Sequence, residues 1–193
     1  MSRLILASAS PQRKTLLRAL GLGFEVVPSG IEEDDHPESD PKRRAADLAR
    51  LKAREIARRH PGVIVIGCDT LVVAPDGTLL EKPVSEVDAR RMLGLQSSAT
   101  SVVHSALCVV DAQGKLHEGV NSSRVTFKKL TEKEIDWWMG TGQWRDRSGA
   151  FQIDGRGQLM ISKIEGDYTG IVGLPVFLLG ELLSKAGYDL KKL

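Results

Sequence analysis

Cysteine and aromatic residues are scarce in this chain of 193 residues, and neither sign of charge dominates. Cys68 and Cys108 are too few for a disulfide framework and show no metal-binding spacing, so we expect a reduced, cytoplasmic setting. Aromatic residues make up 5% of the chain and the formal net charge is only +2. A nucleic-acid-binding protein normally carries a larger basic excess, so we expect no nucleic-acid partner.

Long hydrophobic runs are missing as well. No stretch approaches the roughly 20 apolar residues that a membrane span requires, so we expect no membrane partner. The opening residues, "MSRLILASASPQRK", turn polar too early for a signal peptide. A hydrophobic content of 41% is nevertheless ample for a globular core, and we expect residues 1–193 to form a single domain.

Helix and strand patterns follow one another along the whole chain. We expect helices over residues 11–20, 41–59, 85–95, 131–142 and 174–186. We expect strands at residues 4–6, 24–29 and 157–164, a buried strand over 63–74 that "GCDT" interrupts, and two long antiparallel strands within 100–130. This mixture predicts an α/β fold with a twisted mixed sheet flanked by helices.

The segment "SASPQRK" combines a helix start with cations. Ser10 can cap the helix and Pro11 suits its first turn, but Arg13 and Lys14 then lie at the positive end of the helix dipole. A capped surface helix with solvated charges would explain this pattern. The alternative is a phosphate site, in which free backbone N–H groups and a cation point at one anion.

Four further charged residues could carry chemistry. Asp69 stands in an apolar run, where a carboxylate must be paired, bound to metal, placed at the mouth of a cleft, or held by backbone hydrogen bonds in a bend. Lys82 precedes Pro83, which favours extended backbone, and Lys52 lies on the helix over 41–59; each could equally be solvated. Glu33 follows an expected strand, where a carboxylate could hold a metal against phosphates.

Seven short motifs in this order resemble the Maf family of nucleotide pyrophosphatases. They are "LILASASPQRKTLL", "SGIEE", "ARLKARE", "GCDT", "EKP", "SGAFQIDGRG" and "IVGLP". The resemblance implies an elongated α/β fold with two lobes around one central cleft, related to inosine-triphosphate pyrophosphatases. It also implies a cytoplasmic enzyme, a homodimer, that cuts a nucleoside triphosphate into monophosphate and pyrophosphate with a divalent metal, Mg or Mn.

The resemblance also assigns roles to individual residues. Asp69 takes the position of the catalytic proton acceptor, and Asp69 and Glu33 take those of the metal-binding carboxylates. The expected substrate-binding residues are Ser8, Ser10, Arg13, Lys52 and Lys82. These roles suit the chemistry, because a carboxylate can accept a proton from water while cations offset the charge of a triphosphate.

Three positions point to different base specificities, so the preferred base stays open. Thr70 resembles the subgroup that hydrolyses dTTP and UTP, whereas Asp154 resembles the subgroup that prefers 7-methyl-GTP, and Gln12 departs from the paired arginines common in the first subgroup. Because an ionised Asp154 offers only acceptors, it favours a base rich in N–H donors.

Two other functions compete with this one. The protein could bind nucleotide without turnover as a regulator of division or septation, in which case Asp69 would be dispensable. The basic helix over 41–59 could instead follow a nucleic-acid backbone, although acidic residues nearly cancel its charge. We expect the tryptophans to pack against the helix over 131–142. Alternatively, Trp138 or Met139 could be exposed and serve a dimer contact, and Trp144 could lie at a dimer contact or at the rim of the cleft.

Overall fold

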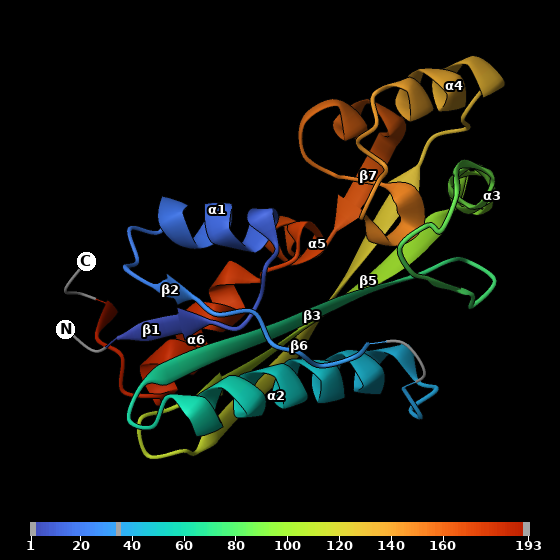
Figure 1. The fold of residues 1–193 in the computed structure, drawn as a ribbon. Helices are drawn as coiled ribbons and strands as arrows, with labels where there is room; N and C mark the ends of the chain where they lie inside the picture. The colour runs from blue at the N-terminus through green and yellow to red at the C-terminus, as the bar shows by residue number, and fades with distance from the viewer. Residues whose placement is uncertain (1–2, 34–35, 191–193) are drawn as a thin grey trace. The chain divides into compact units, whose positions relative to one another are not determined.

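The structure is a computed structural model that describes residues 3–33 and 36–190 (Figure 1). Its contacts divide the chain into two compact units. The first unit comprises Met1–Asp69, Ser105–Asn121 and Gly173–Leu193, and the second comprises Thr70–His104 and Ser122–Val172. Three long strands contribute residues to both: β3 (Ile64–Val73), β5 (Thr100–Val110) and β6 (Leu116–Phe127). No helix in the described residues is long and apolar enough to cross a membrane.

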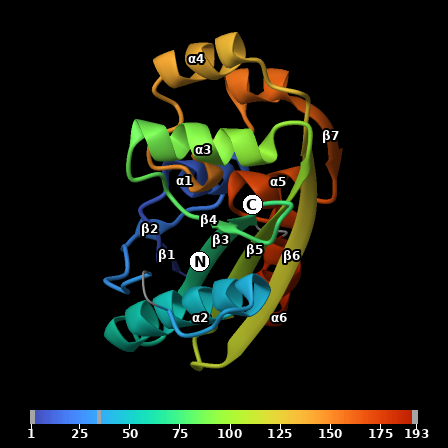
Figure 2. The same cartoon turned by 90° about the vertical axis from the view of Figure 1, so that its right-hand side faces the viewer.

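In the first unit, helices pack on both faces of a sheet. Strand β1 (Leu4–Leu6) pairs in parallel with β2 (Glu25–Val26) and with β3. Leu4, Leu6 and Ile66 share a buried core with side chains of α1 (Pro11–Ala19) and α6 (Val176–Lys185). Helix α2 (Pro41–Arg59) lies along β3 in Figure 1 and Figure 2, and its buried stripe includes Ala45, Ala49, Ala53 and Ile56.

The second unit combines the rest of the long strands with short elements. Two strands pair antiparallel with them: β4 (Leu79–Leu80) with β3, and β7 (Ile161–Glu165) with β6. Its helices are α3 (Glu86–Gln96), α4 (Glu132–Gly140) and α5 (Tyr168–Val172), with 3-10 turns η1 (Ser148–Ala150) and η2 (Gly155–Met160). A separate core, which includes Leu93, Phe127 and Trp138, holds these elements together.

The predicted mixed α/β sheet flanked by helices is confirmed. The seven strands run in the order β2-β1-β3-β5-β6-β7, with β4 on β3. The short turn between β5 and β6 can join only antiparallel strands, as expected. The expected interruption of residues 63–74 at "GCDT" is wrong, because β3 continues through it. The strand expected over 157–164 begins only at Ile161, since Gly155–Met160 form η2. The central cleft stays a prediction.

Trp138 and Trp144 pack inside the protein, as the simpler expectation had it, whereas the alternative of an exposed Trp138 or Met139 is wrong. Trp138, Met139 and Trp144 are all buried. The indole N–H of Trp138 donates to the carbonyl of Ala150 at 2.9 Å, and that of Trp144 to the carbonyl of Met139 at 3.1 Å. Both polar ends therefore find partners inside the core, which makes full burial favourable. These side chains cannot supply the dimer contact.

Candidate active site

A close contact between α2 and β3 builds the centre of the candidate site in the first unit. Gly67 faces the helix, and a Cβ atom added there would lie 2.7 Å from the backbone nitrogen of Ala53 and would collide with the carbonyl of Ala49. Since real Cβ atoms do not approach so closely, only glycine lets the helix lie directly on the strand. Lys52 and Asp69 flank this contact, one on each element.

Lys52 and Asp69 form a buried ion pair. Lys52 Nζ lies 2.6 Å from Asp69 Oδ1 and 2.8 Å from Glu33 Oε1. Lys52 is 4% exposed and Asp69 is 3% exposed, so the lysine is not a solvated helix residue. Asp69 Oδ2 is buried and has no hydrogen-bond partner among the described residues. A buried acceptor without a donor is costly, and it marks a place for a ligand or water.

Glu33 is held against α2 through its own segment. Arg44 donates to the Glu33 carbonyl at 2.9 Å, and Glu55 accepts from the backbone N–H of Gly30 at 3.3 Å. The carboxylate of Glu33 is half-exposed, so it can pair with Lys52 and still be reached from solvent. Sequence reasoning missed Arg44 and Glu55, because charged helix residues look solvated unless a partner segment is known.

The start of α1 carries a second cluster in the same unit. Ser10 caps the helix by accepting from the backbone N–H of Arg13, and Ser10 Oγ donates to Gln12 Oε1 at 3.3 Å. The Arg13 guanidinium donates to Ser8 Oγ and to the Gly173 carbonyl, both at 2.9 Å. Gly173 belongs to the "IVGLP" motif, and its carbonyl explains how that motif serves the site. The arginine is thereby fixed in direction beside a helix N-terminus, as an anion site requires.

The carboxylates of the candidate site suit a divalent metal only if substrate phosphates supply further ligands. No group of three His, Cys, Asp or Glu side chains in the described part of the chain is placed to hold one. Two carboxylates, Glu33 and Asp69, meet the same lysine nitrogen, and Asp69 keeps an unpartnered oxygen. Magnesium commonly binds one or two carboxylates together with substrate phosphates, so the residues fit such an ion.

Cys68 is excluded as a nucleophile or thiolate ligand near neutral pH. Burial raises the pKa of its thiol to about 11. The side chain lies in the apolar core shared by β3, α1 and α6. Asp69, rather than the neighbouring cysteine, is therefore the candidate for chemistry in the "GCDT" motif.

Three predicted site residues belong to the second unit. Lys82 is exposed and lies two residues after the end of β4. Asp154 precedes η2, and its Oδ1 is buried with no partner in the described structure. Burial and the charge of Asp154 raise the pKa of Tyr168, at the start of α5. Thr70 is partly buried and follows Asp69 in β3.

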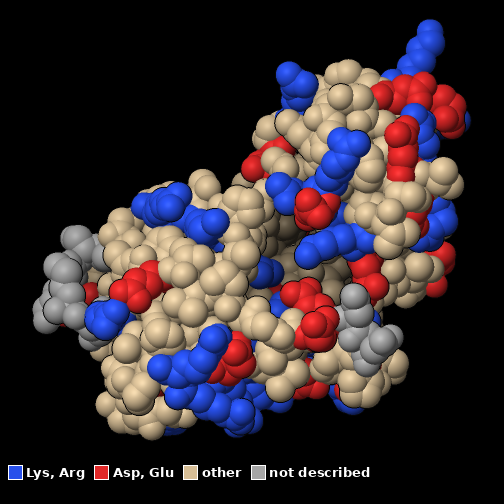
Figure 3. All heavy atoms as spheres, in the orientation of Figure 1, with Lys and Arg blue, Asp and Glu red and all other residues tan. Residues whose placement is uncertain are grey.

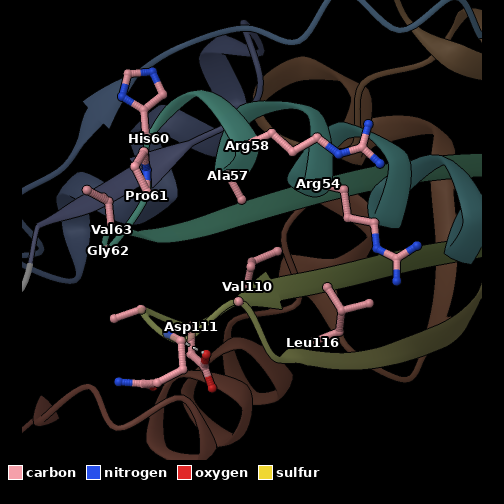
Figure 4. Close-up of a pocket in the computed structure, with 13 residues that line it drawn as sticks. Arg54, Ala57, Arg58, His60, Pro61, Gly62, Val63, Val110, Asp111 and Leu116 are labelled. Carbon is pink, nitrogen blue, oxygen red and sulfur yellow. Dashed lines mark hydrogen bonds between the residues drawn. The ribbon is translucent and has the colours of Figure 1, made fainter.

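A separate pocket in the first unit does not include any predicted site residue (Figure 4). It has a volume of about 380 Å³ and lies between the end of α2 and the turn that joins β5 to β6. The ring of His60 points away from Val110 and Leu116, so the polar groups do not converge on the apolar wall. Asp111 in that turn already accepts from Gln113, Lys115 and His117.

Several cations of α2 are paired with carboxylates of the same unit. Arg50 pairs with Asp47 and Glu118, and Arg59 pairs with Glu55. Figure 3 shows acidic side chains next to basic ones over the visible face.

A family model described as "Maf-like protein" matches residues 3–186. The chain belongs to the Maf family. A dTTP/UTP pyrophosphatase of Deinococcus radiodurans is 45% identical over 185 residues, which cover 96% of this chain and 93% of that protein. One of Moorella thermoacetica is 44% identical over 191 residues, covering 98% of this chain and 97% of that protein.

A solved structure supports the fold assignment for this Maf protein. A HAM1 protein from Coxiella burnetii superposes with a TM-score of 0.53 at 12% identity, and the match covers 98% of this chain and 100% of that one. At so low an identity the likeness concerns the fold alone. It agrees with the mixed α/β sheet that the sequence patterns predict.

Proposed function

We propose that this protein is a nucleoside triphosphate pyrophosphatase. The observation that carries the proposal is the buried Asp69, which Lys52 holds by one oxygen while the other has no hydrogen-bond donor among the residues that the structure describes. The relatives named dTTP/UTP pyrophosphatase, similar over nearly the whole chain, support the same reaction.

Asp69 would act as the proton acceptor for water. Its free Oδ2 takes a proton as the water oxygen bonds to the α-phosphorus, and the bond from that phosphorus to the bridging oxygen breaks. Pyrophosphate leaves with the bonding electrons, and the nucleoside monophosphate retains the oxygen of water. Lys52 fixes the carboxylate direction, which matters because a misplaced base loses much of its effect.

The remaining residues would bind and neutralise the phosphates. Ser8, Ser10 and Arg13 present hydroxyls, a guanidinium and the start of a helix, all of which suit phosphate oxygens. Lys82 of the "EKP" motif would add an ammonium that binds phosphate. Glu33 and Asp69 would hold Mg or Mn together with the phosphates, and such an ion lowers the pKa of bound water and offsets phosphate charge.

The base would be read by Gln12, Thr70 and Asp154. We propose dTTP and UTP as substrates, with a shift toward bases rich in N–H donors, such as 7-methylguanine, because the buried Asp154 Oδ1 can only accept when it is ionised. The proposal extends to a cytoplasmic homodimer, with a dimer contact that does not use the buried Trp138.

A panel of nucleoside triphosphates tests the function. We expect dTTP, UTP or 7-methyl-GTP to give equal amounts of monophosphate and pyrophosphate, with each product measured separately and no added pyrophosphatase. Release of single phosphate would contradict the proposal. Tight nucleotide binding with no turnover at any metal concentration would favour the regulator instead.

A further inference from the structure

Gln96 is a buried amide that no part of the proposed function yet uses. It ends α3 and is 1% exposed. Its Nε2 donates to the carbonyls of Gly149 at 2.8 Å and Met92 at 3.2 Å, and its Oε1 accepts from Ser101 Oγ at 3.4 Å. A site that only needed filling would take an apolar side chain, so these bonds indicate that the amide holds something in place.

The element that Gln96 holds is η1, whose backbone is unfavourable. Gly149 has φ of 73°, and Ala150 has φ of 55° although it carries a Cβ atom. The positive φ favours glycine at position 149, where an added Cβ would lie close to Gln96 Oε1, at 3.3 Å. Left-handed residues other than glycine persist only where their surroundings impose them, and they gather at ligand sites.

Three hydrogen bonds impose this conformation. Gln96 binds the Gly149 carbonyl, and Trp138 Nε1 binds the Ala150 carbonyl at 2.9 Å. The N–H of Gly149 donates to the Glu81 carbonyl at 3.1 Å. Gly149 is therefore held at both of its backbone polar groups. Its carbonyl is bound by Gln96 of α3, and its N–H is bound by Glu81, which follows β4.

These hydrogen bonds reach segments next to two residues of the proposed function, Lys82 and Asp154. Glu81 directly precedes Lys82, whose backbone the following Pro83 keeps extended. Ala150 leads within four residues to Asp154. We propose that Gln96 is a positioning residue: through Gly149 and Glu81 it places Lys82 for the phosphates, and through η1 it places Asp154 for the base. This inference rests on the proposed function.

The test is a double-mutant cycle between Gln96→Met and Lys82→Ala. Methionine fills a similar volume but removes all three hydrogen bonds of the amide. With dTTP or UTP as the substrate, we expect Gln96→Met to lower the kcat of the otherwise unchanged protein about 10-fold or more. In the Lys82→Ala background, we expect the same substitution to lower kcat by less than about 3-fold. A role in stability alone would give equal losses in both backgrounds, and that result would overturn the inference.

A pair of tryptophan variants provides the matched control. Trp138→Phe and Trp144→Phe each remove one buried indole hydrogen bond to a carbonyl in the same unit, but the bond of Trp138 goes to η1 and that of Trp144 goes to α4. We expect Trp138→Phe to repeat the non-additivity with Lys82→Ala, and Trp144→Phe to keep kcat within about 2-fold. This pair also decides the matter if Gln96→Met does not fold. Equal effects of the two tryptophan variants on kcat would contradict the inference.

The cycle separates this inference from the proposed function. If Lys82→Ala alone leaves turnover unchanged, the proposed role of Lys82 fails and the positioning role fails with it. If Lys82→Ala lowers kcat, and Gln96→Met lowers kcat by the same factor with and without Lys82→Ala, only the proposed role of Gln96 fails.

Discussion

The two units place their candidate functional residues by different physical means. In the first unit, Lys52 and Asp69 stand on a helix and a strand that touch at Gly67, so packing of regular elements sets their 2.6 Å contact. In the second unit, Lys82 and Asp154 lie outside helices and strands, and we infer that they are held through η1, whose carbonyls bind the buried side chains of Gln96 and Trp138. Packing of regular elements tolerates little change in volume, whereas a held loop tolerates little change in hydrogen bonding.

The largest effect should come from adding one methyl group to the first unit. Gly67→Ala places a Cβ against Ala49 and Ala53, and we expect a loss of about 3 kcal/mol or more in the free energy of unfolding, measured in urea. The same change in the second unit, Gly94→Ala, meets nothing within 4 Å on an exposed face of α3 and should stabilise by up to about 1 kcal/mol. Equal changes in the free energy of unfolding for the two variants would show that α2 and β3 are not tightly packed at Gly67.

Removing the carboxylate charge should come next in size. Asp69→Asn keeps the shape but loses the proton acceptor, and we expect kcat to fall at least about 100-fold. Asp111→Asn is the matched control, because Asp111 is also buried in the first unit but accepts hydrogen bonds only within its own turn and from His117. Kinetics on folded variants, checked by circular dichroism, should separate the two. A folded Asp69→Asn variant with near-normal kcat would move the base elsewhere, first to Glu33.

A smaller effect should appear in base preference in the second unit. Asp154→Gln replaces a carboxylate, which only accepts hydrogen bonds, by an amide that also donates them. We therefore expect the ratio of kcat/KM for 7-methyl-GTP to kcat/KM for dTTP to fall about 10-fold. The ratio is its own control, because a general loss of stability or of phosphate binding changes both values together. An unchanged ratio would mean that Asp154 does not read the base.

The same difference between the units explains what the sequence could predict. Hydrophobic periodicity and caps gave α1, α2, α3 and α4 nearly as they stand. The family motifs pointed to Lys52 and Asp69, but periodicity alone could not separate Lys52 from the other cations of α2, since the approach of Glu33 and Asp69 is tertiary.

The second unit was harder to predict because its organising contacts are long-range. A glutamine at a helix end normally looks solvated, so Gln96 gave no signal. The short turns η1 and η2 lack periodicity, and the sequence of η2 alone is typical of the start of a strand. The burial of Trp138 depended on the carbonyl of Ala150, which is made available by an unfavourable backbone conformation.

The most direct test of the central claim, attack of water on the α-phosphorus, is the fate of the water oxygen. Hydrolysis of dTTP or UTP in water enriched in oxygen-18, followed by mass spectrometry of both products, locates the new bond. The account predicts one heavy oxygen in the nucleoside monophosphate and none in the pyrophosphate. Label in the pyrophosphate, or in released single phosphate, would show that water attacks another phosphorus and would contradict the account.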